Sequence, residues 1–400
     1  MMKAGKIISL LSLGLFGLAS YAESNKNACY IMYDAGSSGT RLYVYEQTDN
    51  QLIEHEGPKV AALADPVRSF RRKTPADIEA VTDEVVNALN LIKVDGPLDD
   101  GKPKWQGFDW DAKCNVSSAK VYATAGMRIA EQENPTDSVT LWKTLHTKLQ
   151  TRVGVGANVE TRTLSGFEEG LFAWLSVKGE SKETGFGNVE MGGASSQITF
   201  PCSDCSTEND AVRTIQLGGK PLQMYSYSFL GLGQDEAPKS LPDPYVDPVP
   251  ASCAHGVGGQ DNSWSEALCE AEITILAGEA IRDPYNYVAG RKTRGTENTL
   301  PDGKESIAQW TLTGAFNYAK DTDIQECCID GSDACFQPET SCFRPIYQKK
   351  YLTVLGVDAE DANKRNASWT QGAVICETEN CLASQAAAPV CRWTAEGCLQ

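Results

Sequence analysis

The pattern of apolar and polar positions predicts a β-hairpin close to the start of the chain. Two runs rich in aromatic and β-branched residues, 30–33 and 42–45, flank the small-residue segment AGSSGT at 35–40. Strand-like runs around a glycine-bearing turn are typical of a hairpin. A six-residue connection is long for a hairpin, so we expect this segment to form a functional loop rather than an ordinary surface turn.

A similar pattern recurs in residues 189–200, which read VEMGGASSQITF. Glu190 precedes a Gly pair and a Ser-bearing turn much as Asp34 precedes Ala35-Gly36, and a β-rich run follows at 198–200. The two acidic residues are 156 positions apart. Self-similarity at that distance predicts two related lobes, each offering one loop to a shared cleft.

Helical and strand-like patterns alternate in the remaining segments. A strand at 121–123 is predicted to run through Thr124-Ala125-Gly126 into a helix, which leaves free N–H groups for an anion. Arg128 would add positive charge there or pair with an acid. The other predicted elements are a helix over 74–93, a strand over 159–164, a helix over 273–290 and a closing helix after 366–376.

Two adjacent glutamates near the middle of the chain receive different predictions. Ser165 and Glu168 fit a capping box, in which the Glu side chain reaches back to the first residue of the helix. Glu169 has no such structural task, and its neighbour Gly170 is expected to leave open space beside it. Glu169 is therefore a candidate general base, although an acid in the first turn also simply complements the helix dipole.

The composition of both loops suits a phosphate group. Glycines let the backbone approach a ligand closely, and consecutive N–H groups with hydroxyls can surround anionic oxygens. Asp34 would repel a phosphate, so we expect it to hold a cation or the water of a cation.

The first 22 residues are predicted to be an export signal that is removed. Lys3 and Lys6 precede a short apolar run at 7–18, and Ser20-Tyr21-Ala22 fits a cleavage site. Loss of the two lysines takes the formal charge from −17 to −19. This acidity argues against nucleic acid as a partner, and no later run is apolar enough for a membrane anchor. We expect a secreted or periplasmic protein.

All 14 cysteines lie in the mature part of the chain, which favours disulfides over zinc in an exported protein. The close pairs Cys202/Cys205 and Cys376/Cys381 leave a zinc site open as the alternative. Connectivity does not follow from spacing. The local candidates are Cys253–Cys269, Cys327 or Cys328 with Cys335 or Cys342, and Cys391–Cys398.

Taken together, the motifs resemble those of the ecto-apyrases, the nucleoside triphosphate diphosphohydrolases (NTPDases). DAGSSGT, ATAGMR, SGFEEGLFAW and EMGGASSQ match the family's motifs in order, and YSFLGLGQDEA and SWTQGA match its looser later segments. The resemblance implies an α/β fold of the actin–hexokinase superfamily, with two ribonuclease-H-like lobes around a nucleotide cleft. We expect residues 23–162 plus about 368–400 in lobe I and 163–367 in lobe II.

The resemblance also implies a role for each matching residue. Glu169 would be the general base, with Ser195 and Gln197 placing the attacking water. The phosphate-binding residues would be Ser37, Ser38, Gly39, Thr40, Thr124, Ala125, Gly192, Gly193, Ala194 and Ser195. Asp34 and Glu190 would hold a divalent cation, Ca²⁺ or Mg²⁺, through water, with Trp369 nearby. Tyr347 and Tyr351, at helical i, i+4 spacing, would clamp the base unless they belong to the core.

Two departures from the family pattern bear on the site. Glu190 stands where the family usually has Asp, and Gly39 where many animal members have His.

The expected activity is hydrolysis of the terminal phosphate of nucleoside tri- and diphosphates, such as ATP and ADP, by a monomer. The alternatives are an exopolyphosphatase of the same superfamily and a non-enzymatic exported nucleotide-binding module.

Overall fold

The computed structural model describes residues 26–49, 51–68, 75–179, 183–205, 211–240, 251–253, 265–273, 306–318 and 342–383. It also describes residues 304 and 328, and the backbone of short strands at 280–282, 286–288, 291–293, 297–299, 392–394 and 397–399. The predicted export segment, residues 1–22, lies outside the described residues.

The first sheet is built around the predicted hairpin. Its strand order is β19-β18-β7-β6-β1-β2-β3. The hairpin strands β1 and β2 are antiparallel, and β6 lies parallel to β1 on its other side. The bounds are β1 Asn27–Gly36, β2 Gly39–Gln47, β3 Leu52–Val60, β6 Cys114–Ala123, β7 Asn158–Thr163, β18 Arg392–Thr394 and β19 Gly397–Leu399.

The second sheet repeats this arrangement, in the order β10-β11-β9-β8-β16-β17. Here β8 and β9 form the antiparallel hairpin, and β16 lies parallel to β8. The two-lobe repeat predicted from the sequence is therefore confirmed. The bounds are β8 Phe186–Met191, β9 Ser195–Pro201, β10 Val212–Leu217, β11 Lys220–Leu230, β16 Gln309–Gly314 and β17 Asn363–Lys364.

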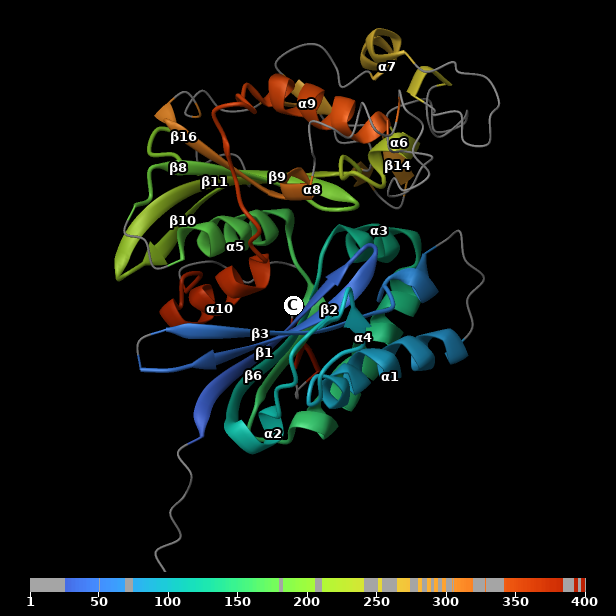
Figure 1. The fold of residues 1–400 in the computed structure, drawn as a ribbon, viewed down its shortest axis with the longest axis vertical. Helices are drawn as coiled ribbons and strands as arrows, with labels where there is room; N and C mark the ends of the chain where they lie inside the picture. Colours follow the sequence, from blue (N-terminus) through green and yellow to red (C-terminus); the bar gives the residue numbers. More distant parts are fainter. Residues whose placement is uncertain are drawn as a thin grey trace, which may run out of the picture.

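Helices cover both outer faces and fill the space between the sheets (Figure 1). α1 and α4 pack on the first sheet, α9 packs on the second, and α5 and α10 lie between the sheets. The bounds are α1 Pro75–Leu91, α2 Trp110–Lys113, α3 Ala125–Glu133, α4 Pro135–Val153, α5 Gly166–Lys178, α6 Ala237–Ser240, α7 Glu266–Glu272, α8 Ala315–Tyr318, α9 Phe343–Leu355 and α10 Trp369–Glu379. Among the described residues, no helix combines the length and the apolar character needed to cross a bilayer.

The apolar core between the sheets joins the two halves of the molecule. Met32 and Tyr45 of the first sheet and Met224 of the second pack with Trp174 of α5 and Val374 of α10. All five side chains are fully buried. Because apolar side chains of both sheets share one core with α5 and α10, their burial fixes the position of these helices between the sheets.

The first hairpin is tighter than expected. Ala35 pairs with Thr40 and Gly36 with Gly39, so the turn consists of Ser37 and Ser38 alone. The expectation of a long loop was wrong, because small residues adjoining the turn continue the ladder. The glycine at position 39 has φ = +154°, a conformation that L side chains rarely adopt.

Other predicted elements are mostly confirmed. The helix expected at 74–93 is α1 and the strand at 159–164 is β7. The closing helix, α10, begins within the segment 366–376 that was expected to precede it. The strand at 121–123 forms the end of β6, and α3 follows it at once. The helix predicted at 273–290 is wrong, because the described part of this segment contains two strands, β12 Ala280–Arg282 and β13 Asn286–Val288.

Disulfides account for every cysteine whose side chain is described. The long-range bridge Cys29–Cys114 joins β1 to the start of β6. The local candidates Cys253–Cys269 and Cys328–Cys342 are confirmed, and the side chains of Cys391 and Cys398 lie outside the described set. The pairs suggested as an alternative zinc site are disulfides instead, Cys202–Cys205 and Cys376–Cys381.

Candidate active site

The turns of the two hairpins open into one cleft. Its volume is about 930 Å³, within the usual size of small-molecule sites. First-sheet residues and the start of α3 contribute Asp34, Gly36, Ser37, Ser38, Gly39, Arg41, Lys59 and Thr124. The remaining lining includes Glu169, Glu190, Gly192, Gly193, Gln234, Tyr318, Arg365 and Trp369.

The two repeated turns meet at the floor of this cleft. A Cβ built on Gly193 would lie 2.3 Å from Ser37 Oγ, so no larger residue at this position would let the turns approach so closely. The start of α3 also joins them, because a Cβ on Gly126 would lie 3.1 Å from Ser37 Cα. Three backbone segments rich in N–H groups therefore converge, which suits an anionic ligand.

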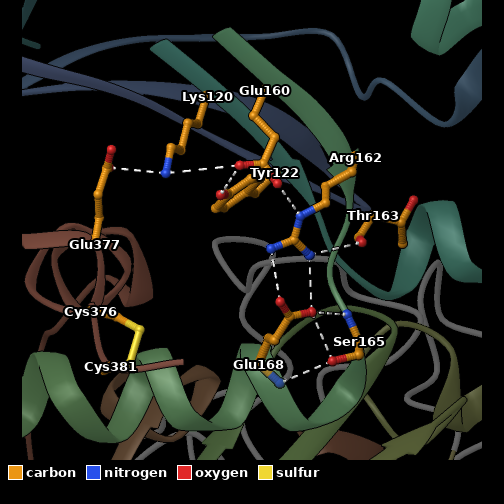
Figure 2. A network of polar contacts seen from close by, with 10 residues as sticks. All are labelled: Lys120, Tyr122, Glu160, Arg162, Thr163, Ser165, Glu168, Cys376, Glu377 and Cys381. Carbon is orange, nitrogen blue, oxygen red and sulfur yellow. Dashed lines mark hydrogen bonds and ion pairs between the residues drawn. A yellow bond between two sulfur atoms is a disulfide. The ribbon is translucent and has the colours of Figure 1, made fainter. Parts of the chain in front are cut away.

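Helix α5 begins with the predicted capping box. The Ser165 hydroxyl accepts a hydrogen bond from the backbone N–H of Glu168, and the Glu168 carboxylate accepts from the Ser165 N–H at 3.0 Å. Figure 2 shows a further partner that the sequence did not predict. Arg162 of β7 donates two hydrogen bonds to Glu168, at 2.8 and 2.9 Å, and both side chains are buried.

The Arg162–Glu168 ion pair belongs to a larger buried network (Figure 2). Glu160 accepts hydrogen bonds from Arg162 at 2.6 Å and from Tyr122 at 3.0 Å. Lys120 contacts Glu377 of α10 at 3.0 Å. Burial alone would raise the pKa of Glu168, but the charge and hydrogen bonds of Arg162 outweigh it and lower the pKa. Glu168 is thus an ionised structural group.

Glu169, the next residue, faces the cleft. Its side chain is 3% exposed and forms an ion pair with Arg128 of α3. Arg128 also donates to Ser195 Oγ at 3.1 Å, and Gln197 donates to the same oxygen at 2.6 Å. Burial, opposed by Arg128, raises the pKa of Glu169 to about 7. The structure therefore brings the predicted base together with the two residues predicted to place water.

Gly170 does not leave open space beside Glu169, and this expectation was wrong. A Cβ at this position would lie 2.3 Å from Ser226 Oγ and 2.4 Å from Thr199 Oγ1. Gly170 instead allows α5 to pack closely on strands β9 and β11, which carry these hydroxyls. Its role is close helix–sheet packing.

Asp34 and Glu190 occupy equivalent ends of the two hairpins, where Asp34 pairs with Arg41 in the ladder and Glu190 with Gln197. Burial raises the pKa of Asp34 to about 6, while Arg41 and a hydrogen bond from Trp369 lower it. Burial, followed by the charges of Glu169 and Asp34, raises the pKa of Glu190 well above its ordinary value. Trp369 therefore lies beside Asp34, as expected.

These donors fit a hydrated divalent cation. Glu190 Oε2 and Gln197 Oε1 are buried acceptors that receive no hydrogen bond from the described residues. Hard cations such as Ca²⁺ and Mg²⁺ prefer carboxylate, carbonyl and water oxygens. Within the described residues, no group of three or more His, Cys, Asp or Glu side chains is placed to enclose a bare ion. The carboxylates of Asp34 and Glu190 and the amide oxygen of Gln197 would thus hold such a cation through its bound water.

The predicted phosphate-binding residues divide into two groups. Ser37, Ser38, Gly39, Thr124, Gly192 and Gly193 line the cleft. Thr40, Ala125, Ala194 and Ser195 lie behind this surface and are at most 2% exposed. The side chains of Ala125 and Ala194 pack against Ile129 and Leu230, so these two alanines join the turn of the second hairpin to α3.

The prediction that Tyr347 and Tyr351 clamp the nucleobase is wrong. The two residues share helix α9 as predicted, with ring centroids 5.9 Å apart. Both rings are fully buried in the core beneath the second sheet, and the Tyr347 hydroxyl donates to Leu232 O at 2.5 Å. Neither ring has a free face for a base, because the i, i+4 spacing directs both toward the sheet.

Other residues of the cleft were not singled out by the sequence. Tyr318, at the end of α8, is 68% exposed and donates a hydrogen bond to Asn366 at 3.3 Å. Arg365 donates to Val177 O at 2.9 Å on the same side of the cleft. Tyr318 lies in a short aromatic segment, but its exposure depends on how β16 and α8 are placed, which no local pattern reveals.

Comparison with known proteins agrees with the motifs. Residues 109–247 match the GDA1/CD39 (nucleoside phosphatase) family. The matched segment contains Thr124, Arg128, Glu169, Glu190 and Ser195. The resemblance predicted from the motifs is therefore confirmed.

The chain is similar to animal and plant proteins. It is 26% identical over 273 residues to ectonucleoside triphosphate diphosphohydrolase 2 of Gallus gallus, covering 60% of this chain and 50% of the relative. It is 30% identical over 254 residues to probable apyrase 5 of Arabidopsis thaliana, covering 60% of this chain and 47% of the relative. The chain thus spans about half the length of these curated relatives.

A solved structure shares the fold. The crystal structure of nucleoside triphosphate hydrolases from Neospora caninum aligns with a TM-score of 0.52 at 14% identity, covering 90% of this chain and 93% of that one. At this identity the similarity concerns the fold alone. Together with the repeated sheets, it confirms the predicted α/β fold with two similar lobes.

The Arg162–Glu168 ion pair predicts a large stability effect from a single substitution. Glu168→Ala removes the cap and leaves Arg162 buried with Glu160 as its remaining carboxylate partner. Breaking a buried ion pair costs roughly 3–5 kcal/mol of unfolding free energy, and we expect about 3 kcal/mol here. Urea unfolding provides the measurement.

Glu79→Ala supplies the matched control, because it removes an exposed ion pair with Lys148 from α1. It should cost at most about 1 kcal/mol. A loss for Glu168→Ala no larger than that of the control would show that the buried pair does not hold α5 in place.

Proposed function

We propose that this protein is an apyrase, which hydrolyses the terminal phosphate of nucleoside tri- and diphosphates with a divalent cation. The observation that carries the proposal is the convergence of both hairpin turns, the start of α3 and the buried Glu169 on one cleft. The GDA1/CD39 domain and the names of the relatives support the nucleotide class.

Glu169 is proposed as the general base. Its raised pKa places proton uptake near neutral pH, where a base accepts a proton from water most effectively. Ser195 Oγ, which receives hydrogen bonds from Arg128 and Gln197, is held close to Glu169 and would orient the attacking water. Arg128 favours the ionised form of Glu169 until the proton is taken.

The phosphate chain is proposed to lie between the two hairpin turns. Backbone N–H groups at Ser37, Ser38 and Gly193 would bind its oxygens as negative charge develops. Asp34 and Glu190 would hold Ca²⁺ or Mg²⁺ through water, with the buried amide oxygen of Gln197 as a further acceptor. When bound, the cation would neutralise phosphate charge.

The nucleobase of the substrate is proposed to stack on the ring of Tyr318. Among the described aromatic residues that line the cleft, Tyr318 is exposed, whereas Tyr43 and Trp369 are buried. Arg365 and Asn366 lie beside Tyr318 and offer hydrogen-bonding groups for the base or ribose.

The division into lobes and the location of the protein are also proposals. We assign 23–162 plus about 368–400 to lobe I and 163–367 to lobe II, which the membership of the two sheets supports. The disulfides support an oxidising compartment outside the cytoplasm, and we propose a secreted or periplasmic monomer.

An exopolyphosphatase is the second candidate function, since inorganic polyphosphate is an anionic chain of linked phosphates like that of a nucleoside triphosphate.

Phosphate release from ATP, ADP, AMP and polyphosphate, with and without EDTA, tests the proposed activity. We expect rapid release from ATP and ADP, little from AMP, and loss of activity with EDTA that added Ca²⁺ or Mg²⁺ restores. Release from polyphosphate alone would favour the exopolyphosphatase, and activity that survives complete chelation would remove the metal from the mechanism.

Glu169→Gln tests the base directly. The variant keeps a hydrogen-bonding side chain but cannot accept the proton, so kcat should fall by roughly 10²–10⁴. In the wild type, kcat should decline as pH falls through about 7, because protonation of Glu169 removes the base. A bound cation near Asp34 would move this inflection to lower pH, since positive charge favours the carboxylate.

The pH profile of Glu169→Gln should lack that inflection. Glu168→Gln serves as the neighbouring control, because its side chain can still bond Ser165, and it should keep most of the activity. If instead Glu168→Gln is inactive and Glu169→Gln active, the base is assigned to the wrong glutamate.

Tyr318→Ala tests the proposed contact with the nucleobase. Stacking of a nucleobase on an aromatic ring contributes about 1–3 kcal/mol, so KM for ATP should rise roughly 5- to 150-fold while tripolyphosphate hydrolysis is unchanged. Tyr347→Phe, which alters a buried ring away from the cleft, is the control. Equal losses on both substrates would exclude Tyr318 as a base contact.

A further inference from the structure

Two cations face each other beside the first hairpin turn. Arg41 of β2 and Lys59 of β3 are directly opposite in the antiparallel ladder, and both line the cleft. Like charges directly opposite in a sheet are destabilising. Arg41 is partly balanced by Glu56, 3.8 Å away. Among the described residues, Lys59 forms no ion pair, and it donates a hydrogen bond to Ser38 Oγ at 3.4 Å.

A β-bulge creates this unfavourable pairing. Tyr43 pairs with Glu56 and Arg41 with Lys59, so two residues of β3, Gly57 and Pro58, oppose Leu42 alone. Without the extra residue, Pro58 would lie opposite Arg41. Bulges commonly re-aim a side chain near a functional site. The backbone of β3 is therefore shaped to place Lys59 next to Arg41.

Gly39 provides the space that Lys59 occupies. A Cβ at position 39 would lie 2.3 Å from Lys59 Cε and 3.1 Å from its Cγ. The lysine side chain thus runs across the face of Gly39 and ends at the hydroxyl of Ser38. Any side chain at position 39 would displace it. The glycine that departs from the family pattern and the lysine opposite it are sterically linked.

From this arrangement we propose that Lys59 binds phosphate oxygens of the substrate, in the space that a side chain at position 39 would otherwise fill. This inference rests on the proposed function, because it takes the turn at Ser37–Ser38 as the phosphate site. An anion between Lys59, Arg41 and this turn would relieve the repulsion between the two cations. Burial and the charge of Arg41 lower the pKa of Lys59, and the charges of Asp34 and Asp235 partly oppose them.

Equilibrium binding of two probes, the non-hydrolysable analogue AMPPNP and inorganic tripolyphosphate, tests the inference. Lys59→Met should weaken binding of both by roughly 10- to 100-fold, as expected for loss of a hydrogen bond to a charged group. Lys59→Arg should recover most of the affinity. Lys102→Met, which removes an exposed lysine from the short strand β5 (Lys102–Pro103) away from the cleft, is the matched control and should leave both affinities unchanged.

A double-mutant cycle tests the link to Gly39. Gly39→Ala should reduce affinity as Lys59→Met does, and the double variant should lose little more than either one. Additive losses would mean that Gly39 acts through its own backbone, and would overturn the link between the positions. If Lys59→Met binds both probes as tightly as the wild type does, the proposed contact between Lys59 and phosphate is wrong.

Failure of this inference is distinguishable from failure of the proposed function. If the wild type binds tripolyphosphate through Lys59 but releases no phosphate from nucleotides, the function is wrong and the Lys59 contact stands. If the wild type hydrolyses ATP and Lys59→Met hydrolyses and binds equally well, the contact is wrong and the function stands. A wild type that binds neither probe would overturn both.

Discussion

The buried ion pair between Arg162 and Glu168 determines where helix α5 begins. Arg162 comes from the last part of β7, and Glu168 from the first turn of α5. The pair ties the end of the first sheet to a helix that also packs on the second. Because Glu168 is directed to Arg162, the next residue, Glu169, is directed to the cleft. A shift of the helix start by one residue would place Glu168 where Glu169 now lies.

The floor of the cleft concentrates carboxylates away from water. Burial raises the pKa of Asp34, Glu169 and Glu190, and the charges of Asp34 and Glu169 raise that of Glu190 further. Arg128 offsets only part of this repulsion. Such a site favours groups that bring positive charge, and a cation with its water would do so. Buried charge is therefore the physical basis of both the proposed metal site and the proposed base.

Local signals made much of this predictable from the sequence. The repeated acid–glycine–serine turn implied paired hairpins, and the spacing of Ser165 and Glu168 separated two neighbouring glutamates. Contacts between distant segments were not predictable. Arg128 and Glu169 meet only because α3 and α5 converge on the cleft. The spacing of Tyr347 and Tyr351 is the same for a ligand clamp and for a core, and packing on the second sheet decides between them.

The stereochemical course at the transferred phosphorus tests the central claim most directly. A nucleoside triphosphate whose terminal thiophosphate is made chiral with oxygen isotopes would be hydrolysed in isotopically labelled water. Direct attack by a water activated at Glu169 predicts inversion of configuration, since a single in-line displacement takes place. Retention would show two successive displacements through a covalent phosphoenzyme, and would contradict the account of the cleft given above.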